Sequence, residues 1–141
     1  MDNIYYSIIT IPTIDIVLCF FFGTKARWFQ LHSAINIIIV NIIKDDVYKL
    51  LFKPHYIATL EDPQELYYIC FLHLYHILFF KKTFIDYVHH IVFVLFGTLP
   101  VYYYFNVNLL RLATFVGCGL PGIIEYLSLS LVKHERIDSI T

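Results

Sequence analysis

Three ionisable side chains lie close together in the otherwise apolar segment 83–97. They are Asp86, His89 and His90, and their spacing of i, i+3 and i+4 puts them on one face of a helix. An imidazole is a natural general base near neutral pH, and a carboxylate on its far nitrogen fixes its tautomer. Ionisable groups are costly at membrane depth and usually mark a function there. The segment therefore predicts a site that does acid–base chemistry or binds a polar group.

A second pair of histidines is expected to face this trio. His73 and His76 lie at i and i+3 in the apolar block 66–80, which is followed by a pair of lysines. So short a turn makes the two helices antiparallel neighbours. At a rise of about 1.5 Å per residue, His73 and His89 lie at nearly the same depth. The sequence thus predicts histidines that face each other from adjacent helices.

Further polar groups fall inside apolar blocks. His32 and Asn36 lie at i and i+4 in the block 28–43, on one stripe of a helix. Glu125 follows the segment 117–122, whose three glycines and one proline predict a broken or kinked helix with a close backbone approach. These groups either line the same site or form hydrogen bonds between helices, which contribute about 0.6 kcal/mol each on average.

Composition and block length indicate what positions these side chains. The chain has 141 residues and is 59% hydrophobic, against about 45–50% in a water-soluble domain. The apolar residues fall into blocks of roughly 15–24 residues, the length needed to cross a bilayer. The predicted fold class is all-α: one domain, 1–141, forming a polytopic membrane bundle of about five helices. The expected spans are 4–22, 28–43, 66–80, 84–105 and 109–132, with a polar loop at 44–65 that carries a short interfacial helix over 47–52.

Charge and cysteine usage argue against other classes. The formal net charge is −1 and the basic residues are scattered, which gives no footprint for nucleic acid. The three cysteines stand apart, in neither a disulfide framework nor a zinc pattern. The N-terminus lacks a basic region and a cleavage signature, so the first block is expected to stay as a helix. Trp28 follows a basic turn and is expected at the membrane interface.

Together, the polar positions resemble the TLC-domain superfamily of multi-pass membrane proteins, which includes the ceramide synthases. The resemblance covers most of the chain after Ala26 and lies in four motifs: Arg27-Trp28-Phe-x-Leu-His32, His73-x-x-His76, Asp86-x-x-His89-His90 and Gly119-Leu-Pro-Gly-x-x-Glu125-Tyr126. It implies a helical membrane bundle around a lipid-sized cavity, in an endomembrane such as the endoplasmic reticulum. In the ceramide synthase branch, such histidines serve acyl transfer from acyl-CoA to a sphingoid base amine.

The resemblance also implies roles for these residues. His89 and His90 would act as general base or acyl acceptor, and Asp86 would orient them. The other polar positions would line the lipid or substrate site: His32, Asn36, His73, His76 and Glu125. Acyl-CoA would be the donor, no other cofactor is expected, and the expected partners are membrane lipids. The oligomeric state is left open.

Other functions fit the same residues. One is lipid binding without catalysis, in a factor for membrane composition or trafficking whose histidines hydrogen-bond a headgroup. Another is an intramembrane metal or haem protein, because imidazoles suit zinc or iron; its ligands would be His73, His76, His89 and His90. In a purely structural alternative, the polar groups only hold helices together.

Overall fold

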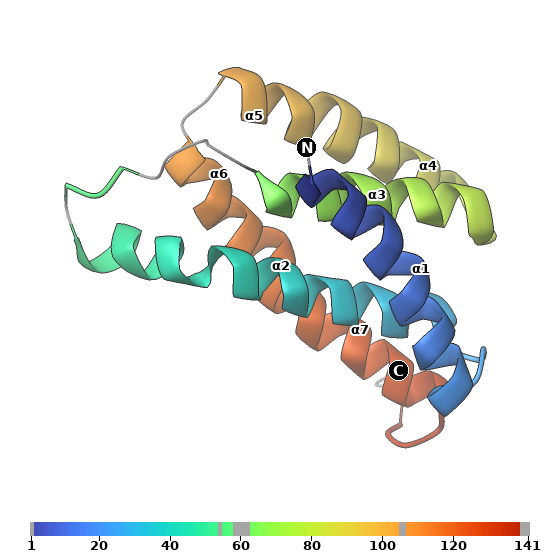
Figure 1. Ribbon diagram of the computed structural model, residues 1–141. Helices are drawn as coiled ribbons and strands as arrows, with labels where there is room; N and C mark the ends of the chain where they lie inside the picture. Colours follow the sequence, from blue (N-terminus) through green and yellow to red (C-terminus); the bar gives the residue numbers. More distant parts are fainter. Residues whose placement is uncertain (1, 54, 58–62, 105–106, 139–141) are drawn as a thin grey trace.

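The computed structural model describes residues 2–53, 55–57, 63–104 and 107–138. Regular structure in these ranges is entirely helical, which confirms the all-α class. The α-helices there are α1 (Asp2–Phe22), α2 (Arg27–Phe52), α3 (Gln64–Phe79), α4 (Phe84–His89), α5 (Leu99–Tyr104), α6 (Val107–Ala113) and α7 (Leu120–Lys133). In the same ranges, the π-helical segments η1 (His90–Thr98) and η2 (Thr114–Gly119) join α4 to α5 and α6 to α7. Helix α4, segment η1 and helix α5 form one continuous helical rod, and α6, η2 and α7 form a second (Figure 1).

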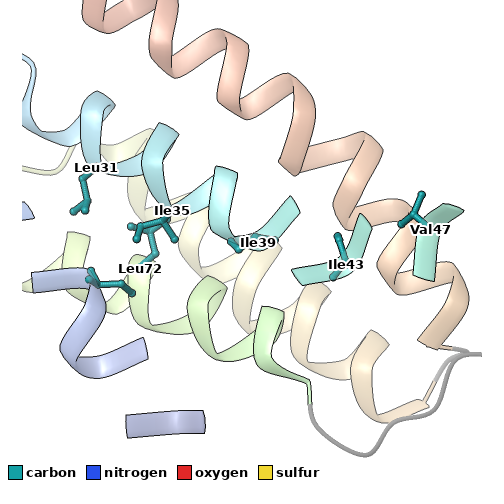
Figure 2. Packing of buried hydrophobic residues seen from close by; sticks show 7 residues of the cluster. Leu31, Ile35, Ile39, Ile43, Val47 and Leu72 are labelled. Atoms are coloured by element: carbon teal, nitrogen blue, oxygen red, sulfur yellow. The ribbon is translucent and has the colours of Figure 1, made fainter. Parts of the chain in front are cut away.

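Helix α2 is the element around which the others pack (Figure 1). It contacts α1, α3, α6, η2 and α7, while α3 also contacts η1. Its buried apolar stripe repeats once per helical turn: Leu31, Ile35, Ile39, Ile43 and Val47. Figure 2 shows Leu72 of α3 beside this stripe, and Ile11 of α1 completes the cluster. Burial of one face of α2 therefore organises the bundle.

The polar segment 44–65 is helical further than the sequence predicts, because α2 continues to Phe52. Val47 extends the buried apolar stripe past the charged residues that mark the expected end of the helix. Asp46 is not a loop residue: it accepts a hydrogen bond from Arg111 of α6 at 2.6 Å. The predicted loop is therefore wrong over its first part, and the expected interfacial helix is the last part of α2.

Two described helical stretches are long and apolar enough to cross a membrane. They are Ile4–Phe22 and Asn108–Lys133, and Phe84–Thr98 is a shorter apolar helix. The expected blocks 66–80, 84–105 and 109–132 correspond to α3, to the rod from α4 to α5 and to the rod from α6 to α7. The turn predicted between the last two blocks falls partly on residues 105–106, which lie outside the described ranges. The number of about five spans stays a prediction.

Candidate functional site

The helix that carries the Asp–His–His trio begins with a capping box. Thr83 Oγ1 accepts a hydrogen bond from the backbone N–H of Asp86 at 3.3 Å, and Asp86 Oδ2 accepts one from the backbone N–H of Thr83 at 2.6 Å. Reciprocal bonds of this kind satisfy the free N–H groups of a first helical turn. The structure therefore uses the Asp86 carboxylate as a helix cap, whereas the sequence predicts it beside an imidazole.

The backbone of Asp86, and not its side chain, orients a histidine. Nδ1 of His90 donates a hydrogen bond to the carbonyl oxygen of Asp86, one turn earlier. Nε2 of His90 lies 3.1 Å from Nδ1 of His76 on α3. Both imidazoles are buried. A chain of hydrogen bonds thus runs from the backbone of α4, through one imidazole, to a second imidazole on the neighbouring helix.

The remaining histidines surround this pair. The ring centroid of His73 lies 5.5 Å from that of His89 and 5.0 Å from that of His90. Nδ1 of His73 donates to the carbonyl oxygen of Ile69 at 2.7 Å. The ring centroid of His32 lies 6.1 Å from that of His73. The predicted meeting of histidines from adjacent helices at one depth is confirmed.

Helix α2 adds an amide and an imidazole. Asn36 Nδ2 donates to Nδ1 of His32 at 3.1 Å, and it also lies 3.5 Å from the carbonyl oxygen of Cys118 in η2. Ser33 Oγ donates to the carbonyl oxygen of Ile123 in α7 at 3.2 Å. The polar stripe of α2 therefore faces the backbone of η2 and α7, and His32 and Asn36 lie on one helix face as predicted.

Two glycines allow this close approach of α2 to η2 and α7. A Cβ at Gly119 would lie 2.7 Å from Cγ2 of Val40, and a Cβ at Gly122 would overlap the amide of Asn36. The close backbone approach expected at 117–122 is confirmed. The helix is not broken there, because its turns widen into the π-helical segment η2 and continue as α7. Such π-helical turns inside α-helices often occur at functional sites.

Replacing Gly122 by alanine is expected to lower the free energy of unfolding by about 1–2 kcal/mol. The added methyl group would displace the Asn36 amide and weaken its hydrogen bond to His32. Gly117→Ala is the matched control, because a Cβ there meets nothing within 4 Å. Denaturation of both variants in mild detergent tests the expectation; equal stability of the two variants would contradict it.

Two aromatic rings cover the imidazoles. Trp28 stacks on His76 with ring centroids 3.7 Å apart, and Tyr126 stacks on His32 with ring centroids 3.9 Å apart. Trp28 is thus packed against the histidine cluster, and its interfacial position stays a prediction. The spacing of i, i+4 between Trp28 and His32 is the signal that points to this contact, because it places both rings on one helix face.

A cavity of about 230 Å³ lies among these side chains. Predicted site residues in its wall are His32, Asn36, His73, His89 and Glu125. The π-helical segments contribute as well, η1 through Thr98 and η2 through Thr114 and Cys118. The structure therefore brings together five of the predicted residues, from helices that are far apart in the sequence.

A larger and more open groove of about 840 Å³ adjoins the cavity. Glu125 and Tyr126 line both hollows, so the two share a wall. The groove holds two more predicted residues, His76 and Asp86. His90 is buried and connects the hollows through its hydrogen bond to His76 and its ring contact with His73. Basic side chains border the groove: Lys25, Arg27, Lys81 and Lys133.

The metal alternative concerns the same histidines. Within the described ranges, no group of three or more histidine, cysteine, aspartate or glutamate side chains is arranged to hold a metal ion. Nδ1 of His76 and Nε2 of His90 are directed at each other, 3.1 Å apart. These two nitrogens therefore make a hydrogen bond between imidazoles.

No protein-family model, no curated protein and no solved structure matches this chain. The resemblance to the TLC-domain superfamily stays a prediction that rests on its four motifs. What the fold and the site define by themselves is an all-α helical protein with a histidine-lined cavity beside a basic groove.

Proposed function

We propose that this chain is a multi-pass membrane protein of lipid metabolism that binds a lipid headgroup in its histidine-lined cavity. The observation that carries the proposal is the convergence of histidines from α2, α3 and α4 around one cavity. Ionisable side chains at membrane depth are expensive, and helix–helix contacts alone seldom need so many of them at one depth.

The outer surface supports a membrane environment. Large apolar side chains are exposed on α1, for example Ile16 at 69% and Phe20 at 82%. In the most apolar part of each of the stretches Ile4–Phe22 and Asn108–Lys133, only 17% of the residues are buried inside the protein. Water-soluble monomers rarely expose large contiguous apolar patches, whereas a bilayer solvates them. An endomembrane such as the endoplasmic reticulum is part of the same proposal, and it rests on the TLC resemblance.

The volume of the cavity supports a headgroup and not a whole lipid. Pockets for drug-sized ligands usually measure about 300–1,000 Å³, and this cavity measures about 230 Å³. Cys118 lines the cavity and is also exposed, so the cavity reaches the outer surface at η2. A bound lipid would then keep its headgroup among the histidines and its chains in the bilayer.

The cavity wall offers both hydrogen-bond donors and acceptors. Because Nδ1 of His73 donates to a carbonyl, its Nε2 carries the lone pair of the neutral ring. Because Nδ1 of His32 accepts from Asn36, its Nε2 carries the proton. Glu125 adds a carboxylate, and Tyr126 adds a hydroxyl. A headgroup with hydroxyl or amine groups finds partners of both kinds here.

Native mass spectrometry from mild detergent tests the binding proposal. Wild-type protein is expected to carry a lipid mass, and His73→Phe is expected to lower the occupancy about tenfold, because one hydrogen bond in a dry site is worth about 1.4 kcal/mol. His55→Phe is the matched control, because His55 is exposed and does not line the cavity. Equal occupancy in all three proteins would show that the histidines only hold helices together.

Acyl transfer from acyl-CoA to a lipid amine is the reaction that this site supports best. The specific observation is the fixed tautomer of His73, which leaves a ring nitrogen with a lone pair in the cavity wall, as a general base needs. Incubation with acyl-CoA and a long-chain amine is expected to give the amide with wild-type protein and none with His89→Ala. Full turnover by His89→Ala would exclude that residue from the chemistry. Lipid retention without turnover would leave binding as the function.

A further inference from the structure

The donor and the acceptor can be assigned in each of the two hydrogen bonds that link Asp86, His90 and His76. A carbonyl oxygen only accepts, so Nδ1 of His90 donates to Asp86. In a neutral ring the other nitrogen then has the lone pair, so Nε2 of His90 accepts from Nδ1 of His76. The tautomer of His76 is thereby fixed as well: Nδ1 carries the proton, and Nε2 is left with the lone pair.

Burial and stacking hold both rings in this state. His76 is 3% exposed and His90 is 6% exposed, and a charged ring is costly to bury without a counter-charge. Trp28 lies against the face of His76, with an interplanar angle of 16° and ring centroids 3.7 Å apart. A 180° flip of the His76 ring would keep the stack on Trp28 but would put Cδ2 in the place of Nδ1, and so would break the hydrogen bond to His90. The tautomer is therefore set by the surroundings of the ring.

The ring nitrogen with the lone pair, Nε2 of His76, is on a side chain that borders the groove. His76 lines the groove together with Lys81, Asp86 and Lys133. Across the described residues, Nε2 of His76 has no hydrogen-bond partner, because the only hydrogen bond of this ring runs from Nδ1 to His90. His73 has a comparable lone pair, but its Nδ1 is bonded to a backbone carbonyl, which cannot take up a proton.

We propose that Nε2 of His76 is the proton acceptor of the groove and that His90 is its positioning residue. The ligand class is a headgroup that carries a hydroxyl or a neutral amine. As the oxygen or nitrogen of the ligand bonds to the carbonyl carbon of the acyl-CoA donor, its O–H or N–H bond breaks and the proton goes to Nε2 of His76; the thiolate that leaves takes up a proton in turn. The Nδ1 proton of His76 passes to Nε2 of His90, so the positive charge ends on the second ring. This inference rests on the proposed function and goes beyond it, because it places a proton acceptor for a headgroup in the groove that adjoins the cavity.

Nuclear magnetic resonance of the wild-type protein in nanodiscs, labelled with ¹⁵N-histidine, tests the tautomer directly. Nε2 of His76 is expected to resonate as an unprotonated nitrogen and Nδ1 as a protonated one, with the signals assigned by their loss in His76→Gln. A proton on Nε2 of His76 in the wild type would overturn the proposal. The tautomer is read from the wild-type protein, and His76→Gln serves only to assign the signals.

Variants at the neighbouring histidines test the relay. His90→Phe removes the acceptor, and it is expected to move the proton of His76 from Nδ1 to Nε2. His90→Gln keeps an acceptor oxygen and is expected to restore the wild-type pattern, and His89→Gln is the adjacent control that leaves it unchanged. An unchanged His76 spectrum in His90→Phe would remove His90 from the proposal.

A pair of matched probes tests the ligand class. Addition of 1-dodecanol is expected to shift the Nε2 signal of His76, because the hydroxyl donates to that nitrogen, while dodecane leaves the signal in place. A shift with both probes, or with neither, would overturn the assignment of His76 as the proton acceptor of the groove. Failure of the proposed function would show differently, as equal lipid occupancy of wild type and His73→Phe in the mass spectrum.

Discussion

Replacing Arg111 by methionine is expected to lower the free energy of unfolding by about 3–5 kcal/mol. Arg111 Nε donates to Glu65 Oε1 at 2.9 Å, and its Nη1 donates to Asp46 Oδ2 at 2.6 Å. The side chain of Arg111 is 9% exposed and that of Glu65 is 3% exposed. Without the guanidinium, two carboxylates remain close together, and one of them is buried without a counter-charge. Tyr56 also donates to Asp46, and this hydrogen bond raises the pKa of the Tyr56 hydroxyl.

Denaturation in mild detergent measures the effect against two references. Arg136→Met is the matched control, because Arg136 is exposed and its loss is expected to change the stability by no more than about 0.5 kcal/mol. Glu65→Gln combined with Arg111→Met is expected to recover part of the loss, because it removes the buried negative charge together with its partner. A loss of the same size in Arg111→Met and Arg136→Met would contradict this account of the network.

Replacing Arg27 by methionine is expected to cost about 2–3 kcal/mol of stability. Arg27 Nε donates to Asp15 Oδ1 at 2.9 Å, and Tyr75 Oη donates to Asp15 Oδ2 at 2.7 Å. Asp15 therefore ties α1 to both α2 and α3. Its side chain is 2% exposed, whereas that of Arg27 is 33% exposed. The effect falls below that of a fully buried pair, because Arg27 is partly solvated and Tyr75 still donates to the carboxylate.

The lysine variant separates charge from geometry at this position. Arg27→Lys keeps the charge but loses the two-pronged contact of the guanidinium with the carboxylate, so an intermediate loss is expected. Lys25→Met is the control, because its ion pair with Glu135 is exposed and contributes little. The order of stability is then wild type, Arg27→Lys, Arg27→Met. Indistinguishable stabilities of the two Arg27 variants would mean that the guanidinium geometry contributes nothing.

Local patterns predict the helices well, and they fail where a charged residue finds a distant partner. The blocks 66–80, 84–105 and 109–132 appear as helical rods because their apolar residues recur at helical spacing. The sequence predicts that this helix ends at the first charged residues after position 43, whereas α2 continues to Phe52. Asp46 is accommodated inside a helix because Arg111 of α6 lies against it. A single stretch of sequence does not indicate that pairing.

The candidate site likewise contains contacts that the sequence predicts and contacts that it does not. Spacing along one helix or across one short turn predicts that His32 and Asn36 share one helix face and that His73 meets His89 and His90, and the structure shows both. Spacing does not predict that the Asp86 carboxylate caps its own helix while the backbone carbonyl holds His90. Both groups of Asp86 are within reach, and the conformation of the first turn decides between them.

The sequence by itself determines that this protein is helical, that its histidines share helix faces, and that glycines allow a close approach near Gly122. These properties follow from periodicity and residue type, which act over a few neighbouring positions. Only the tertiary structure decides that His76 opens to a groove while His73 opens to a cavity. That separation depends on how α2 and η1 pack against α3, because each ring nitrogen acquires its role from atoms on other elements.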